Sequence, residues 1–454
     1  MEYVKRIIDE TINKKTLAFN AINIVGPKGC GKTRTAKERC KTIIEFQDEE
    51  KREGYLNIAE TAPSLFLKNE KPILFDEWQD APKIWGTIRK NCDDNPDSVG
   101  EYMLTGSTSK RIETPHTGTG RISELQMYPM TLFETGESNG AVSLSEIMNN
   151  KDYDIDGKTS GLKLEDLFFT VCRGGWPRCM AIADRDAKLE IAKDYFKQIC
   201  EKDISAIDKV KRNAEWTKAI LWSYARNIAT TAKKTSIYAD VQANYNVSDT
   251  TILSYIDLLQ QLYVIKDIDA WTPQIRSKTA IRTAKKHIFV DTSIAMAALG
   301  ISPEYFNGDL DLFGHAFENL VIRDLLVYAE AHNANIMHYT DDTGLEADAI
   351  YQMQDGRYAL IEIKTGASKI AAAEKSKANV YKLMSKDFNG NLSSFFSISL
   401  IQRALELLSE KDFAGKDIPY MHAKTIEYLL KQGVCICGTH LDEGSVPYNK
   451  VKEL

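Results

Sequence analysis

The amino-acid sequence predicts an α/β protein whose N-terminal part is built on a parallel β-sheet. Short apolar runs, typical of buried parallel strands, alternate with segments of helical composition, and a glycine-rich turn follows the first run. The predicted strands span residues 21–25, 72–77, 101–107 and 122–127. The predicted helices of this part span residues 3–12, 32–46 and 81–94.

The pattern changes beyond this first domain, which is expected to end near residue 139. Residues 140–160 are polar and rich in Gly, Asn and Asp, as is typical of a linker. A mostly helical stretch then covers residues 161–235. The elements expected after it are a helix–turn–helix at 236–265, a strand at 284–291, a helix at 314–331 and a strand hairpin at 346–364.

Composition narrows the class of protein. The chain of 454 residues is 43% hydrophobic and 27% charged, which is typical of a globular protein of about three domains. Its net charge of −6 excludes a general polyanion binder, so any nucleic-acid surface has to be a local patch. The charged N-terminus lacks a signal-peptide core, and no apolar run is long enough to span a bilayer. We therefore expect a cytoplasmic protein without a membrane partner, whose eight cysteines are free thiols.

The glycine-rich turn has the sequence GPKGCGKT, which fits the G-x-x-x-x-G-K-T pattern of a P-loop. Backbone N–H groups and the following helix would hold phosphates, Lys32 would reach the β- and γ-phosphates, and Thr33 would bind Mg²⁺. ATP and Mg²⁺ are therefore the predicted cofactors. The alternative is a glycine-rich turn that ends in Lys-Thr by chance. The predicted nucleotide-binding residues of this loop are Gly26, Pro27, Lys28, Gly29, Cys30, Gly31, Lys32, Thr33 and Arg34.

Two acidic residues in the segment ILFDEWQD complement the loop. Asp76 ends an apolar strand, where its carboxylate would face the P-loop and bind the same Mg²⁺. Glu77 follows directly and would polarise the attacking water. The alternative is an exposed acidic turn after a strand.

Two further residues are candidates for the reaction. Thr105 ends the strand at 101–107, where its hydroxyl would sense the γ-phosphate; it would otherwise be a plain strand-end residue. Arg121 precedes the strand at 122–127 and would stabilise transition-state charge on the nucleotide of its own or a neighbouring subunit. A neighbouring subunit implies a homo-oligomer, whereas the plain alternative is a surface arginine.

The segments GPKGCGKT, ILFDEWQD, MLTGSTS and GRISELQMYPMTLFE resemble those of bacterial and archaeal AAA+ ATPases that carry a C-terminal domain of unknown function. The segment RGGWPR is similar to the lid motif of that group and of related signal-transduction ATPases. The resemblance covers about residues 1–385, and it implies an AAA+ core at 1–139 and a helical lid at 161–235. It also implies that Gly175 and Pro177 lie near the adenine, although alone they indicate only a loop or helix break.

Residues 236–283 predict a winged helix. Apolar residues recur at helical spacing after Ser248. Ser248 is of a residue type that commonly caps the N-terminus of a helix. The predicted strand YVIKDIDAW follows this helix. The next segment is basic and would grip DNA phosphates as a hairpin beside the winged helix. The alternative is a contact within the chain or between subunits. The basic residues of this segment are Arg276, Lys278, Arg282, Lys285 and Lys286.

A group of charged residues resembles the PD-(D/E)xK nuclease superfamily and implies a restriction-endonuclease-like α/β domain at 284–390. Glu318 lies on a predicted helix, Asp348 begins a predicted strand, and Glu362 and Lys364 share one face of the returning strand. The acids would hold Mg²⁺ for phosphodiester cleavage, with Asp348 and Glu362 as ligands, and Lys364 would orient water. The alternative is a degenerate domain in which these charges only pair with one another.

The resemblance stops near residue 390, and residues 391–454 receive no functional assignment. They contain Cys435, Cys437 and His440, whose spacing fits a four-ligand zinc site poorly. A zinc ion shared between subunits is one alternative, and a plain tail is the other.

The sequence thus predicts an AAA+ ATPase that couples ATP hydrolysis to work on DNA, with a Mg²⁺-dependent nuclease step as a second expectation. The alternative function is a nucleotide-switched regulatory or scaffold protein whose nuclease-like domain cuts nothing.

Overall fold

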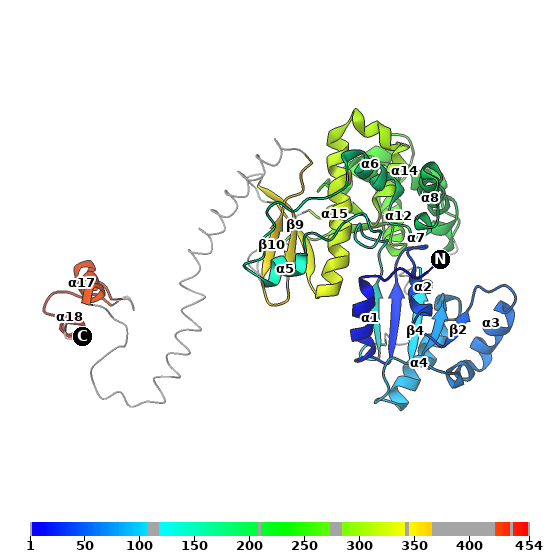
Figure 1. Ribbon diagram of the computed structural model, residues 1–454, viewed down its shortest axis with the longest axis horizontal. Helices are drawn as coiled ribbons and strands as arrows, with labels where there is room; N and C mark the ends of the chain where they lie inside the picture. Colours follow the sequence, from blue (N-terminus) through cyan, green and yellow to red (C-terminus); the bar gives the residue numbers. More distant parts are fainter. Residues whose placement is uncertain are drawn as a thin grey trace. The chain divides into compact units, whose positions relative to one another are not determined.

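The computed structural model describes residues 2–107, 118–207, 210–272, 284–340, 345–365, 423–435 and 439–452. The chain divides into two compact units, Met1–Lys377 and Ala378–Leu454 (Figure 1). All the residues predicted to act on nucleotide or metal belong to the first unit. The domain boundaries predicted inside that unit stay predictions.

The N-terminal domain is a five-stranded sheet in which every neighbouring pair of strands is parallel, as the predicted fold class requires. The strand order is β2-β3-β4-β1-β5. Because β1, β3 and β4 are neighbours that run the same way, the residues after them meet at one edge of the sheet. The strands are β1 (Ala21–Val25), β2 (Thr42–Glu45), β3 (Ile73–Asp76), β4 (Tyr102–Gly106) and β5 (Ile122–Gln126).

Two of the predicted helices need correction. The helix expected at 32–46 ends early: α2 covers Lys32–Lys37, and the β-branched stretch after it forms β2. Pairing of β2 with β3 buries Ile44 and explains why a strand forms there. The first helix, α1 (Ile8–Thr16), begins later than predicted. The segment before it is fixed by Arg6, whose guanidinium donates to the carbonyl oxygens of Cys30 and Tyr128.

Helices cover both faces of this sheet (Figure 1). Side chains alternate along the buried strands, so Ile22 and Ile24 pack with α1 and α2, whereas Ala21 joins the core on the other face. That second face is covered by α3 (Arg52–Thr61), the 3₁₀ helix η1 (Pro63–Lys68) and α4 (Lys83–Asp94).

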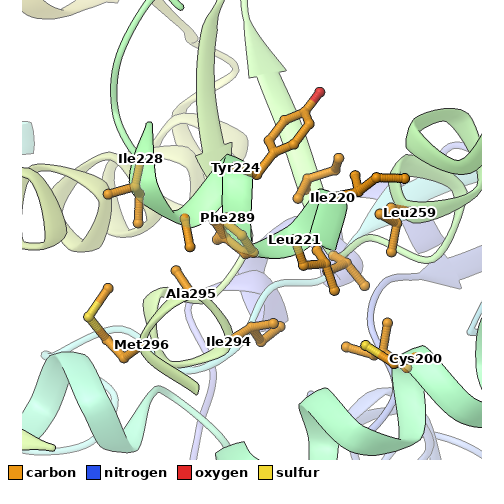
Figure 2. Packing of buried hydrophobic residues seen from close by; sticks show 14 of the residues in the cluster. Cys200, Ile220, Leu221, Tyr224, Ile228, Leu259, Phe289, Ile294, Ala295 and Met296 are labelled. Atoms are coloured by element: carbon orange, nitrogen blue, oxygen red, sulfur yellow. The ribbon is translucent and has the colours of Figure 1, made fainter. Parts of the chain in front are cut away.

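A second hydrophobic core lies among the helices that follow the sheet. In Figure 2, Leu221 of α10 lies on the side of Ile294 of α14, whereas Ile220 and Tyr224 of α10 point away from that helix. The elements around this core are α6 (Leu164–Arg173), α7 (Pro177–Met180), α8 (Arg185–Gln198), the π-helix η3 (Ile199–Asp203), α9 (Ile204–Ala206), α10 (Ala214–Arg226) and α14 (Thr292–Leu299).

Two helices and a strand lie largely in the region predicted as a winged helix, and the strand pairs with a second strand just beyond it. They are α11 (Lys234–Gln242), α12 (Asp249–Gln261), β6 (Ile265–Ile268) and β7 (Lys286–Phe289). Ser248 caps α12 as predicted, because its hydroxyl accepts a hydrogen bond from the N–H of Thr251. The boundary predicted after residue 283 falls between two paired strands, so the winged helix itself stays a proposal.

The last part of the first unit is a three-stranded antiparallel sheet of order β10-β9-β8, packed on a long helix (Figure 1). The hairpin at 346–364 was predicted, but β8 was not. The segment expected to be a linker contains α5 (Leu144–Asn149), which packs on this sheet; the side chain of Asn149 accepts from Arg357 (3.2 Å). The other elements are the 3₁₀ helix η4 (Pro303–Asn307), α15 (Leu310–His332), β8 (Asn335–Thr340), β9 (Glu346–Gln352) and β10 (Tyr358–Ile361).

The second unit contains α17 (Ala423–Gln432) and α18 (Val446–Lys452). Val434 and His440 form an isolated β-bridge beside Cys435, and Cys437 lies outside the described residues. Among the described residues, no group of three or more His, Cys, Asp and Glu side chains is placed to hold a metal ion. The helices described here also include none that is both long and apolar enough to cross a membrane.

Candidate functional site

The P-loop connects the end of β1 to the start of α2 at the carboxyl edge of the parallel sheet. Its lysine, Lys32, is buried, and its ammonium donates to the carbonyl oxygens of Gly26 (3.0 Å) and Pro27 (2.9 Å). Both partners are neutral. The positive charge of Lys32 is therefore not cancelled by a carboxylate and can turn to a phosphate.

Two glycines allow the loop to follow this path. Gly31 caps α2 with φ +110°, a left-handed conformation that residues with a side chain rarely adopt. A Cβ on Gly26 would lie 2.1 Å from the carbonyl oxygen of Met127, so a side chain there would collide with backbone. The loop thus needs glycine at both positions for a close approach of backbone to a ligand.

Asp76, at the end of β3, is the centre of the polar contacts beside the loop. Its carboxylate accepts from the hydroxyl of Thr33 (2.7 Å) and from the hydroxyl of Thr105 at the end of β4. Thr105 also accepts from the N–H of Glu77 (3.3 Å). The two residues predicted to bind Mg²⁺, Thr33 and Asp76, are therefore in direct contact, and two hydroxyls donate to the Asp76 carboxylate.

Glu77 lies in a left-handed conformation (φ +53°), which is uncommon for a residue with a side chain and is concentrated at functional sites. Its carboxylate accepts from the hydroxyl of Ser107 (2.9 Å) and from the amide of Gln79. Sequence reasoning missed Ser107 and Gln79 as partners. Their nearness in the chain to Thr105 and Glu77 was the only signal.

The remaining loop residues hold the P-loop in place. Lys28 pairs with Asp203 of η3 (2.6 Å), and its carbonyl oxygen accepts from the hydroxyl of Tyr195 on α8 (2.8 Å). Cys30 is buried, and Arg34 pairs with Glu38 one turn further along the chain (2.8 Å). The contacts with Asp203 and Tyr195 join the P-loop to the predicted lid.

A cavity of about 210 Å³ adjoins Gly31 on the side of the predicted lid. Pro177 lines it, as does Arg34, whereas Gly175 does not. The backbone of Gly175 is engaged elsewhere: its N–H donates to Asp291 (2.8 Å), and its carbonyl oxygen accepts from the N–H of Met130 (2.7 Å). The cavity has an apolar wall that suits an adenine ring, and its other lining residues are Glu2, Tyr3, Val4, Arg6, Thr35, Met130 and Met180.

Arg121 lies at the opposite edge of the sheet from the P-loop. It precedes Ile122, which pairs with Ala21 at the start of β1, whereas the P-loop follows the end of that strand. At about 3.3 Å per residue, the strand separates the two places by roughly 16 Å. The guanidinium instead pairs with Asp93 (2.6 Å). The predicted role of Arg121 on the nucleotide of its own subunit is therefore wrong, and a role on a neighbouring subunit stays a prediction.

The second predicted site lies between α15 and the antiparallel sheet. The ammonium of Lys364 contacts the carboxylates of Asp348 (3.0 Å) and Glu362 (3.1 Å), and Asp348 also accepts from the N–H of Ile363 (2.7 Å). Burial opposes the charged form of Lys364, but its hydrogen bonds and ion pairs with both acids outweigh burial and raise its pKa. Burial, followed by the charge of Asp348, raises the pKa of Glu362.

Glu318 is paired with a lysine that was not assigned to this site. The buried ammonium of Lys286 donates to the carboxylate of Glu318 and to the main-chain oxygen of Asp348 (3.0 Å). Burial raises the pKa of Glu318 to about 7, although the charge of Lys286 opposes the shift. The prediction that Lys286 grips DNA phosphates is therefore wrong. The position of Lys286 at the start of an apolar strand could have indicated this pairing, because a buried ammonium needs an acidic partner.

This second cluster fits a divalent metal poorly. Each of its three carboxylates has an ammonium partner: Lys286 for Glu318, and Lys364 for both Asp348 and Glu362. A Mg²⁺ ligand set needs carboxylate oxygens that are free to face one ion. The geometry matches the alternative in which these charges pair with one another.

A cavity of about 740 Å³ lies between the edge strand β5 and the predicted winged helix, and four lysines line it. Lys266 donates to the hydroxyl of Tyr128 (2.9 Å), and Lys285 pairs with Asp269 (2.7 Å). The other two, Lys233 and Lys234, begin α11. The remaining predicted basic residues, Arg276, Lys278 and Arg282, lie outside the described residues.

A buried ion-pair network joins the predicted lid to α15. The guanidinium of Arg323 contacts the carboxylates of Asp291 (3.0 Å) and Asp324 (2.7 Å). Asp291 accepts from Gly175, and Asp324 accepts from the N–H of Leu132 just beyond the parallel sheet (2.9 Å). The network therefore contacts the connection after the sheet, the lid motif and α15 at once.

Comparison with protein families matches three successive segments of the chain. Residues 18–136 match an AAA domain, residues 164–305 match the domain of unknown function DUF8612, and residues 313–398 match the domain of unknown function DUF4143. The curated proteins contain no match to this chain.

Two solved structures are similar to the chain at low identity. The Walker-type ATPase PABY2304 of Pyrococcus abyssi is 13% identical, with 65% of this chain and 96% of that chain covered and a TM-score of 0.39. The Aeropyrum pernix ORC1 protein in complex with DNA is 15% identical, with 68% and 95% covered and a TM-score of 0.24. Scores this low define neither fold nor function. The family matches show that this chain contains an AAA domain followed by a C-terminal DUF4143 domain.

Proposed function

We propose that the AAA domain binds ATP and hydrolyses it. The observation that carries the proposal is the contact of Asp76 with Thr33 and Thr105 beside a loop whose buried lysine has neutral partners. Thr33 and Asp76 would hold Mg²⁺, which would neutralise charge on the phosphates. Lys32 would bind the terminal phosphates, and Glu77 would orient the attacking water.

Two variants test this proposal. Lys32→Ala should weaken ATP binding by about 100-fold or more, because it removes a buried cation that faces the phosphates. Glu77→Gln should keep ATP binding but slow hydrolysis by about 10²–10⁴-fold, because the water loses its carboxylate. Binding is followed by calorimetry and turnover by phosphate release. Lys90→Ala is the control, since Lys90 is exposed on α4 outside the P-loop, and unchanged values in both test variants would refute the proposal.

We further propose that ATP hydrolysis drives work on DNA, whose phosphates would contact the lysines that line the cavity between β5 and the predicted winged helix. Lys233 is exposed and Lys234 is half-buried at the start of α11, so both can contact phosphates. Lys266 places a third ammonium on the same wall. A local patch of this kind is what an acidic protein needs to bind a polyanion.

The test is the salt dependence of DNA binding. The double variant Lys233→Ser, Lys234→Ser should reduce the slope of log affinity against log salt by about 1.8 on duplex DNA, since each lost phosphate contact is worth about 0.9. A double variant at the exposed Lys68 and Lys90 on the ATPase core is the control and should leave the slope unchanged. Wild-type protein that binds no DNA at about 50 mM salt would eliminate this proposal.

A second candidate function is a nucleotide-switched regulatory or scaffold protein. Pairing of all three carboxylates in the C-terminal cluster favours it, because the DUF4143 domain would then bind a partner and cut nothing. A nuclease assay with Mg²⁺ or Mn²⁺, with and without ATP, distinguishes an active nuclease from a regulatory or scaffold protein. Cleavage that Asp348→Ala abolishes would favour the nuclease expectation over this one.

A further inference from the structure

The ammonium of Lys286 lies among groups that commonly bind a metal ion. Its nitrogen contacts a carboxylate oxygen of Glu318 and the main-chain oxygen of Asp348. Carboxylate and carbonyl oxygens are the ligands that hard divalent cations prefer. A single positive charge from the chain itself therefore occupies this part of the cluster.

The backbone around Lys286 keeps it there. Lys286 begins β7, where it pairs with Ile268 of β6. Further along β7, the N–H of Phe289 donates to the side chain of Asn319 (2.8 Å), and the Asn319 amide donates back to the carbonyl oxygen of Phe289 (3.0 Å). Asn319 follows Glu318 on α15, so the strand with the lysine and the helix with its acid are fixed to each other by two further hydrogen bonds.

Lys364 supplies a second positive charge on the other side of Asp348. Its ammonium contacts Asp348 and Glu362, so two lysines face three carboxylates. A divalent ion would have to approach two ammonium groups at short range inside a region where charge is poorly screened. It would also have to separate buried ion pairs, which is costly.

We propose that Lys286, which lies in the segment that matches DUF8612, is an internal substitute for a divalent cation in the charged cluster of the DUF4143 segment. The wild-type cluster then binds no Mg²⁺ or Mn²⁺, and its charged residues stabilise the packing of β7 on α15. Removal of the Lys286 ammonium converts the cluster into a metal site in which Glu318 and the main-chain oxygen of Asp348 are ligands. This inference does not depend on ATP hydrolysis or on DNA binding.

The experiment is a Mn²⁺ titration of the full-length chain at pH 8 by calorimetry and electron paramagnetic resonance, without nucleotide. All proteins carry Asp76→Asn, so that the P-loop lacks its acidic metal ligand. We expect no Mn²⁺ at the cluster with Lys286 present. With Lys286→Ala we expect one Mn²⁺ ion to bind at the cluster, with an affinity at least tenfold above any weak binding by the protein that keeps Lys286. Adding Glu318→Gln to that variant should remove the bound ion. Lys286→Arg keeps a cation and should show no gain.

Two results would overturn the proposal. One is stoichiometric Mn²⁺ binding with Lys286 present that Glu318→Gln abolishes, because the lysine would then coexist with a metal. The other is a folded Lys286→Ala variant without increased Mn²⁺ affinity. If loss of the ammonium prevents folding, Lys286→Gln supplies a neutral hydrogen-bond donor for the same titration. A variant that folds only when Mn²⁺ is added would also support the proposal.

Discussion

The P-loop site and the C-terminal cluster both contain buried charged side chains, and these side chains are buried to nearly the same extent. In the P-loop site their partners are neutral, whereas in the cluster their partners carry the opposite charge. Lys32 is 4% exposed and Lys286 is 7% exposed, yet Lys32 contacts two neutral carbonyl oxygens whereas Lys286 contacts a carboxylate. Asp76 and Asp348 are 8% and 7% exposed, but hydroxyls donate to Asp76 whereas an ammonium contacts Asp348.

This comparison shows that burial alone does not make a ligand site. In the P-loop site Lys32 and Asp76 are hydrogen-bonded to neutral groups, so a phosphate and a metal ion can supply their counter-charges. In the cluster the counter-charges come from the chain itself. A charged residue set that fits a nuclease pattern therefore has to be judged by its partners as well as by its order in the sequence.

The largest effect is expected when the charge of Asp76 is removed. Asp76→Asn keeps the shape and the hydrogen-bonding capacity of the side chain but removes the unpaired negative charge. We expect Mg²⁺-dependent ATP hydrolysis to fall by more than about 100-fold, since loss of groups that only support a metal ligand already costs about 10–100-fold. Phosphate release over a range of Mg²⁺ concentrations measures the effect. Activity restored fully by higher Mg²⁺ would mean that Asp76 is not essential for the reaction itself.

Glu318 should make the stability of the folded chain depend on pH. The pKa of Glu318 is raised from 4.5 to about 7 in the folded chain, so the folded state favours the protonated acid. Its effect on stability is then most favourable below about pH 4.5 and is lost as pH rises through about 7. The full difference corresponds to roughly 3 kcal/mol. Between pH 5 and 8, wild type should therefore lose stability relative to Glu318→Gln, as urea unfolding would measure. Parallel pH curves for the two proteins would contradict the prediction.

The smallest effect is expected at Arg121. Its half-exposed pair with Asp93 should contribute at most about 1 kcal/mol, so Arg121→Ala should change thermal stability little. In dilute protein it should also leave hydrolysis per subunit unchanged, because Arg121 lies far from its own P-loop. If Arg121 acts on a neighbouring subunit, wild-type turnover per subunit should rise with protein concentration and that of the variant should not. A large loss of activity in the monomer would show that the assigned edge of the sheet is wrong.

The parallel sheet, the P-loop and the acids Asp76 and Glu77 at the end of β3 could be predicted from the sequence alone. These features are local: a glycine-rich turn has to join a buried strand to a helix, and Asp76 directly ends an apolar run. The order of charged residues from Glu318 to Lys364 was also visible. The boundary between α2 and β2 was missed because Thr42–Glu45 becomes a strand through its pairing with β3.

The contacts of each charged side chain depend on how distant elements pack and could not be predicted from the sequence. Lys286 looked like part of a basic hairpin, but packing of β7 against α15 brings it to an acid 32 residues away and to a carbonyl oxygen 62 residues away. Arg121 looked like a catalytic arginine until strand order and direction placed it at the far edge of the sheet. Sequence spacing defines neighbours within one helix or strand, whereas the pairing of distant charges depends on how separate elements pack, and this pairing determines whether a site can accept a ligand.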